Sequence, residues 1–314
     1  MNWPSYNQSL VKRGEILLGF DVINNWDTEL KEMNQGKIEE PFHYPNTFLL
    51  LLGYAKAYFH LPYRQTEGIT QAHAKEKVPS IPNYTTINRR INRLDIQIKD
   101  TTDSSKEFED EYIVIAIDST GIKITNRGQW MQDKWHIKNK KGYLKIHVAV
   151  NVKTKKILAM KVTDEHVHDS KTLPGLVDDV IKSDNMTTTA AAASAAAAAA
   201  AIGKLIADGG AYDSNNIFGY LGDNGIHPCI KVRKNSKVRW MKKGDILRNL
   251  SVVAQKKDLQ KWKDSVSYGQ RWIVETVFSC IKRRFGEYVY SVKLQNIIQE
   301  LMLKASLYNK LISI

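Results

Sequence analysis

Three carboxylates, far apart in the chain, are the residues best suited to carry chemistry. Asp118 follows the apolar run YIVIAI, Asp208 follows KLIA, and Glu275 lies in the amphipathic segment SYGQRWIVETVFSCIKRRFGEY. Each aspartate alone would be an ordinary turn cap. Together with the glutamate they supply the hard oxygen ligands that Mg²⁺ takes, and two such ions can drive an in-line phosphodiester displacement. The set predicts metal-dependent phosphoryl transfer.

Long polar side chains accompany Glu275. On an α-helix with about 100° per residue, Tyr268, Arg271 and Lys282 fall within about 40° of Glu275. Arg271 and Glu275 alone would be an ordinary i, i+4 ion pair. The longer row favours a carboxylate site beside phosphates, because Arg holds a phosphate as a fork, Lys as a point charge, and Tyr by a hydrogen bond.

The charge of the chain is concentrated in two blocks. The 314 residues include 46 Lys and Arg against 33 Asp and Glu, a net charge of +13. Residues 119–161 hold eleven basic side chains and one acidic, and residues 231–263 hold twelve and two, so each block is +10 and the rest is acidic. Solvated lysine-rich surfaces are the alternative, but blocks flanking the carboxylates favour nucleic acid. Trp130, in the first block, could stack on an unpaired base or pack against the sheet.

The elements that must position the carboxylates read as a mixed α/β fold. The β-branched run 112–118 predicts a strand that is buried on both faces. A hairpin is predicted over 142–151 and 156–163, further strands over 204–208 and 226–232, and helices over 169–182, 214–223 and beyond. Strand-ending aspartates lie where open α/β sheets present their chemistry.

Residues 1–105 are predicted to be mostly helical, followed by an acidic linker over 100–111. One helix is expected to be capped by Asn46 and to end before Pro62. A second, over 83–96, carries Arg89, Arg90 and Arg93 opposite a buried stripe of Ile87, Ile91 and Leu94. This helix could be the recognition element of a helix-turn-helix, and an ordinary amphipathic surface helix is equally consistent.

Other features exclude several classes of protein. The two cysteines, Cys229 and Cys280, have no CxxC spacing, which excludes a disulfide scaffold and fits a reducing cytosol. The N-terminus lacks a signal-peptide pattern, and the richest apolar stretch, 47–61, is too short to span a bilayer. The alanine-rich tract 187–201 favours helix but specifies no chemistry. His166, His168 and Asp169 resemble a metal cluster, although without Cys or a further His nearby a structural or substrate-side role is favoured.

Together, Asp118, Asp208 and the spacing Tyr268-x2-Arg271-x3-Glu275-x6-Lys282 resemble the signature of DDE transposases from prokaryotic insertion sequences of the cut-and-paste kind. The segments YPNTFLLLLGYAKAYFHLPYRQTEG and PNYTTINRR are similar to the N-terminal region of such enzymes. The resemblance covers the chain from about Pro41 to its C-terminal helix. Two departures are the alanine tract before the second aspartate and the modest insertion over about 231–263.

The resemblance implies an α/β, ribonuclease-H-like mixed sheet flanked by helices over 106–314, and a helical DNA-binding and assembly region over 1–105. It implies cleavage at the terminal inverted repeats of an element and transfer of the 3′-hydroxyl into target DNA, by a cytoplasmic, nucleoid-associated homodimer with no membrane contact. Two Mg²⁺ ions, for which Mn²⁺ is expected to substitute, would bind the three carboxylates. The expected DNA contacts are Tyr268, Arg271 and Lys282, with Arg89, Arg90 and Trp130 as further candidates.

Two rival interpretations stay open. A nuclease or junction resolvase of the same fold would cut DNA without joining it. A DNA-binding protein derived from a transposase would keep the basic blocks and lose carboxylates, and all three carboxylates are present here.

Overall fold

The computed structural model describes residues 2–18, 24–98, 112–124, 143–185, 202–239 and 244–314. The chain divides into two compact units, Met1–Gln97 with Arg284–Ile314, and Ile98–Arg283. The predicted linker, Trp130 and the alanine tract lie outside the described residues. The functional boundary near residue 105 stays a prediction.

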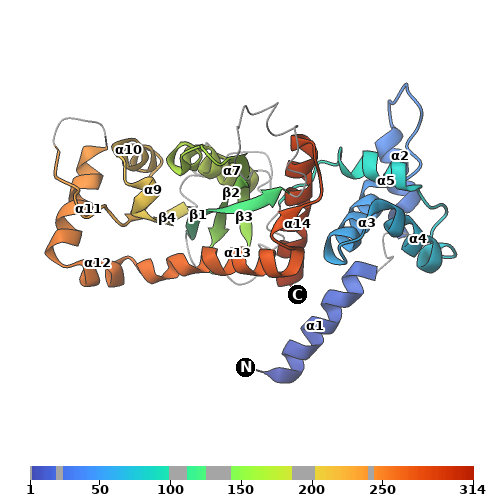
Figure 1. Cartoon of the computed structure of the whole chain (residues 1–314), viewed down its shortest axis with the longest axis horizontal. Helices are drawn as coiled ribbons and strands as arrows, with labels where there is room; N and C mark the ends of the chain where they lie inside the picture. Colours follow the sequence, from blue (N-terminus) through green and yellow to red (C-terminus); the bar gives the residue numbers. More distant parts are fainter. Residues whose placement is uncertain (1, 19–23, 99–111, 125–142, 186–201, 240–243) are drawn as a thin grey trace. The chain divides into compact units, whose positions relative to one another are not determined.

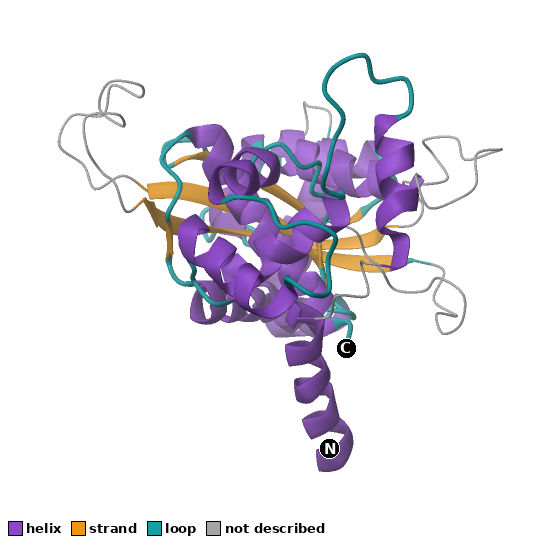
Figure 2. Ribbon diagram, turned by 90° about the vertical axis from the view of Figure 1, so that its right-hand side faces the viewer, coloured by secondary structure: helices purple, strands orange, loops and turns teal. Residues whose placement is uncertain are grey.

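The second unit is built on a mixed sheet, as predicted. Five strands follow the order β3-β2-β1-β4-β5, with β1, β2 and β3 antiparallel to one another and β4 parallel to both β1 and β5. They form one twisted sheet (Figure 2). The bounds are β1 (Ile113–Ile124), β2 (Tyr143–Asn151), β3 (Ile157–Asp164), β4 (Ile202–Ala207) and β5 (His227–Ile230).

Helices cover both faces of this sheet. Figure 1 shows α7 and α10 on one side and α13 on the other. The core lies between the sheet and α7 and α10, where Ile115 and Ile117 of β1 are fully buried. The helices and 3₁₀ turns of this unit are η2 (Asp169–Lys171), α7 (Leu173–Asn185), α9 (Gly209–Tyr212), α10 (Asn215–Asp223), α11 (Asp245–Lys257), α12 (Leu259–Ser265), η3 (Tyr268–Arg271) and α13 (Trp272–Phe285).

Strand β1 is longer than its apolar run indicated. The sequence placed Asp118 at the end of the strand, and this expectation is wrong, because the antiparallel ladder with β2 continues from Ile115 opposite Asn151 to Lys123 opposite Tyr143. The parallel ladder with β4 runs only to Ala116. Asp118 therefore lies inside a strand but just beyond its parallel pairing.

The first unit is helical, with one short strand. Its elements are α1 (Trp3–Leu18), α2 (Trp26–Asn34), α3 (Asn46–Tyr58), α4 (Tyr63–Ala74), α5 (Tyr84–Ile91), β6 (Tyr288–Val289) and α14 (Leu294–Ile312). Helix α3 packs on α14, where the hydroxyls of Tyr54 and Ser306 are 2.8 Å apart. The C-terminal helix thus belongs to the same compact unit as the N-terminal helices.

Two local expectations in this unit need correction. Asn46 does not cap α3, because it is the first helical residue, and the Glu29 carboxylate of α2 instead accepts the Thr47 N–H at 3.0 Å. Helix α5 ends at Ile91, earlier than predicted, although Ile87 and Ile91 are buried as expected.

Candidate active site

The sheet brings Asp118 and Asp208 to one edge. In the parallel ladder Ala116 of β1 lies opposite Ile206 of β4, and the aspartates follow two residues later on each chain segment. Strand β4 ends at Ala207, and the Asp208 carboxylate caps α9 by accepting the Gly210 N–H at 3.1 Å. Both aspartates therefore lie just beyond the carboxyl end of the parallel pairing of β1 and β4, although Asp118 itself is inside β1.

Side chains along β1 point alternately to the two faces of the sheet, and this decides which residues they contact. Successive residues of a strand point to opposite faces, so Asp118 and Thr120 share the face opposite the α7 and α10 core. Arg271 Nη1 lies 3.1 Å from Asp118 Oδ2 and Lys282 Nζ lies 2.7 Å from Thr120 Oγ1. Arg271 Nη2 also lies 2.5 Å from Glu275 Oε1. The structure thus joins Asp118, Arg271 and Glu275 in one ion-pair network.

Tyr268 does not continue the α-helical row. Helix α13 begins at Trp272, and Tyr268 and Arg271 lie in the preceding 3₁₀ turn, where about three residues per turn replace the assumed 3.6. Tyr268 is buried, its ring packs on Trp262 with centroids 5.3 Å apart, and its hydroxyl donates to the Ala207 carbonyl at 3.4 Å. Burial raises the pKa of Tyr268 to about 12. Tyr268 thus contacts the end of β4 next to Asp208.

The pKa of Asp118 responds to the charges of both other carboxylates. Burial raises the pKa of Asp118, and the nearby charges of Glu275 and Asp208 raise it further. The Ser119 N–H and Arg271 oppose this shift but do not outweigh it. Like charges held close together favour a bound cation.

The donor set fits a divalent cation, although its ligands are not yet gathered around one point. Among the described residues no three His, Cys, Asp or Glu side chains are placed as a metal site, and Arg271 supplies the positive charge between Asp118 and Glu275. Among the residues that the structure describes, the buried Tyr212 hydroxyl has no hydrogen-bond partner, and its pKa is raised by burial and by Asp169, Asp118 and Asp208. Since buried hydroxyls normally have a partner, a water or an ion-bound ligand among the carboxylates fits there.

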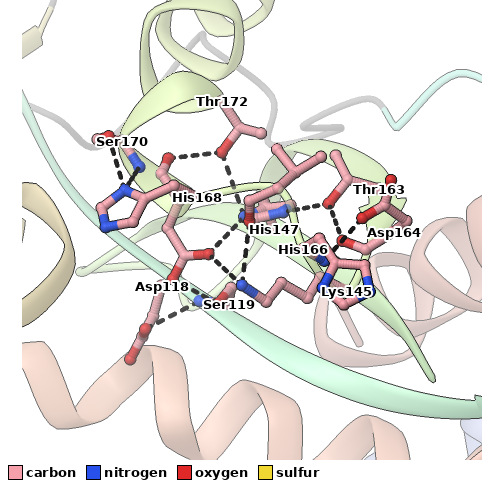
Figure 3. Close-up of polar contacts among 12 residues, drawn as sticks. Asp118, Ser119, Lys145, His147, Thr163, Asp164, His166, His168, Ser170 and Thr172 are labelled. Atoms are coloured by element: carbon pink, nitrogen blue, oxygen red, sulfur yellow. Dashed lines mark hydrogen bonds and ion pairs between the residues drawn. The ribbon is translucent and has the colours of Figure 1, made fainter. Parts of the chain in front are cut away.

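A polar network behind Asp118 escaped the sequence analysis. On the opposite face of β1, Ser119 Oγ donates to Asp169 Oδ2 at 2.9 Å (Figure 3). Lys145 Nζ lies 3.2 Å from Asp169 Oδ1, and the fully buried His147 lies 3.8 Å from the same oxygen. Burial lowers the pKa of His147, which favours the neutral imidazole. Asp169 therefore anchors the strand segment that carries Asp118. Its EHVHD motif was the only signal in the sequence, which favoured a structural or substrate-side role over a metal cluster but indicated none of the partners of Asp169.

Two of the remaining candidates belong to the first unit. Arg89 is exposed on α5. Arg90 is engaged within its own unit, since Nη2 lies 2.7 Å from Asn46 Oδ1 and the guanidinium lies 4.2 Å from the Phe42 ring centroid. Trp130 lies outside the described residues.

Two family models match the chain. One, described as a transposase DDE domain, matches residues 109–310, and a second with the same description matches residues 11–127. The first match covers more than half of the chain and includes every element of the candidate site. Over the described part of the chain, none of the helices has the length and apolar character needed to cross a lipid bilayer.

Proposed function

Because this chain belongs to the DDE transposase family, we propose that it cuts DNA at the ends of a mobile element and joins the freed 3′-hydroxyl to target DNA. Members of the family are polynucleotidyl transferases and endonucleases that act on DNA and use divalent metal ions. The observation that carries the proposal is the ion-pair network of Asp118, Arg271 and Glu275 at the edge of the sheet where Asp208 ends β4.

In this proposal Asp118, Asp208 and Glu275 hold two Mg²⁺ ions, for which Mn²⁺ can substitute. Bound there, the ions would activate the attacking oxygen and stabilise the leaving oxygen. Arg271, released from the carboxylates, turns to a phosphate of the DNA end, and Lys282 binds a neighbouring phosphate. Tyr268, packed against Ala207, completes the Tyr-x2-Arg-x3-Glu-x6-Lys pattern of cut-and-paste insertion-sequence enzymes and positions Arg271.

DNA recognition is assigned to residues 1–105 and the basic insertion over about 231–263, with catalysis in residues 106–314. Arg89 is the better candidate for a DNA contact on α5, because Arg90 is already bound to Asn46 and Phe42. Trp130 is proposed to stack on an unpaired base. We expect a homodimer that pairs two element ends and acts in the cytoplasm on nucleoid DNA.

A two-stage assay tests this function. Full-length protein is incubated with a plasmid carrying the terminal inverted repeats, with Mg²⁺ or with EDTA, and then with a precleaved repeat ending in a 3′-hydroxyl plus target DNA. Metal-dependent cleavage and joining of the precleaved end support the transposase. Cleavage without joining identifies a nuclease or resolvase, and binding without either reaction identifies a non-catalytic DNA-binding protein.

Replacing Lys282 by Ala is expected to weaken DNA binding and to lower the salt dependence of log Kd by about one unit, because one phosphate contact is lost. Fluorescence anisotropy in EDTA at several salt concentrations measures this slope. Lys182→Ala, on the exposed last turn of α7 and outside the regions assigned to DNA recognition, is the control for an equal loss of charge. An unchanged slope in the Lys282 variant would remove Lys282 from the DNA interface.

Replacing Arg271 by Ala is expected to tighten Mn²⁺ binding to the DNA-free protein several-fold, because the guanidinium no longer competes for Asp118 and Glu275. A partly exposed ion pair is worth about 1 kcal/mol or less, which limits the gain to that range. The same variant should bind DNA ends more weakly. Electron paramagnetic resonance of free Mn²⁺ gives the affinity, with Arg283→Ala as a matched control on the same helix. Unchanged or weaker Mn²⁺ binding would contradict the competition.

A further inference from the structure

A polar cavity of about 390 Å³ opens in the second unit beside the loop that follows Asp208. Its walls come from the start of α10, the segment after β5 and the first turn of α11. We infer that this cavity binds one backbone phosphate of the DNA strand that passes the carboxylate site. The inference rests on the proposed function only in taking DNA as the ligand.

The charge of the lining selects an anion. Arg233, Lys237, Arg239 and Arg248 line the cavity together with a single carboxylate, that of Asp213, which leaves a net +3. Asp213 is itself neutralised, because Arg248 Nε lies 2.7 Å from Oδ1 and Arg248 Nη2 lies 3.2 Å from Oδ2. The charges of the other three basic side chains, which are exposed, therefore face no second carboxylate in the cavity.

The chemistry of the lining selects a phosphate and not a base or an apolar ligand. Every lining side chain among the described residues is charged, an amide or a hydroxyl, so these residues offer no aromatic ring on which a base could stack. Guanidinium, ammonium and amide donors are the groups that contact phosphate oxygens in DNA complexes. The cavity should therefore fix the position of a strand without reading its sequence.

The cavity wall contacts the short helix α9 that Asp208 caps. Arg233 Nη2 donates to the Gly210 carbonyl at 2.9 Å, which joins the cavity wall to α9. A Cβ atom on Gly209 would clash with the Lys231 carbonyl oxygen, so only glycine permits α9 to begin against the end of β5. The Arg239 N–H donates to Asn249 Oδ1 of α11 at 3.0 Å. A phosphate in the cavity is thereby held at a fixed place along the strand from the phosphate being cut.

The test uses full-length protein and a fluorescent duplex of arbitrary sequence in EDTA, with anisotropy measured over a range of salt. The double variant Lys237→Ala/Arg239→Ala is expected to bind at least tenfold more weakly at moderate salt, with a slope of log Kd against log salt lower by about one unit. Lys182→Ala/Lys293→Ala removes the same charge from two exposed lysines outside the regions assigned to DNA recognition, at the end of α7 and before α14, and should change Kd less than threefold. An unchanged slope in the cavity variant, or an equal loss in the control, overturns the inference.

A second arm separates the cavity from general charge and from misfolding. Replacing chloride by inorganic phosphate at equal ionic strength should weaken DNA binding by the parent protein and have a smaller effect on the cavity variant. Equal effects on both would overturn the inference. Arg239→Gln, a single exposed substitution, repeats the measurement if the double variant unfolds at a lower temperature. Both experiments measure DNA binding without a divalent metal, and neither measures cleavage. A chain that does not cut DNA can therefore still pass this test, and one whose cavity does not bind phosphate fails it.

Discussion

Asp118→Asn, Asp208→Asn and Glu275→Gln are each expected to lower metal-dependent DNA cleavage by at least ~10³-fold. An amide keeps the shape of the side chain but removes the negative charge that would hold a divalent ion. Metal ions supply several kcal/mol of transition-state stabilisation, and each ~1.4 kcal/mol is tenfold in rate. Binding of DNA in EDTA should stay equal or become tighter, because a negative charge leaves a site that faces phosphates.

The control is Asp264→Asn, an exposed carboxylate on α12 that takes part only in a contact with Gln260 among the bonds described. The Asp264→Asn variant should cleave DNA at the same rate as the parent protein. Calorimetric titration with Mn²⁺ gives a second measure, since loss of a ligand lowers the number or affinity of bound ions even when no DNA is present. Any one variant that keeps cleavage within tenfold of the parent would remove that carboxylate from the mechanism.

The second large effect is expected at a buried ion pair. Asp213→Asn should lower the free energy of unfolding of the unit Ile98–Arg283 by about 3–5 kcal/mol, because Arg248 would remain buried without its carboxylate. The Asp213 side chain is 1% exposed and also accepts hydrogen bonds from the Arg233 N–H at 3.0 Å and the Ser236 hydroxyl at 2.6 Å.

Urea unfolding followed by circular dichroism measures this loss. The double variant Asp213→Asn/Arg248→Met should recover much of it, since no unpaired charge is then buried. A loss below about 1 kcal/mol in the single variant would show that solvent reaches Arg248 and that the pair does not hold the structure.

The same pair sets a pH dependence. Burial alone would raise the pKa of Asp213, but the hydrogen bonds from Arg248, Arg233 and Ser236 outweigh it and lower that pKa. Because the folded pKa is below the unfolded value of about 3.9, the stabilisation is present above that pH and is lost as the pH falls through the folded pKa. The difference in unfolding free energy between the parent and Asp213→Asn should therefore shrink at acid pH.

Much of the fold follows from local patterns in the sequence. The apolar β-branched runs predicted the start of β1 and the positions of β2 to β5 within a few residues, because buried strands require such runs. The order of elements then indicated a mixed sheet, and the residue spacing around Glu275 indicated the family that the matches show. The proposal that Asp118, Asp208 and Glu275 are the ligands stays a prediction.

The wrong predictions have one cause. The local sequence pattern of a segment does not show which distant segments it will pair with. The end of β1 was misplaced because its polar half is held by β2, and the Asn46 cap was wrong because Glu29 of another helix supplies the acceptor. The stripe through Tyr268 assumed one helix where a 3₁₀ turn precedes α13.

The sequence by itself determined the types of residue at the site, the strands that carry the aspartates and the concentration of positive charge. Only the tertiary structure decided that Arg271 bridges Asp118 and Glu275, that Asp169 supports β1 from behind, and that Arg248 neutralises Asp213 under a basic cavity. The physical reason is that secondary structure follows from neighbours in the chain, whereas the charge state and contacts of a side chain depend on distant residues that the fold brings together, as with Arg271 and Asp118, which are 153 positions apart.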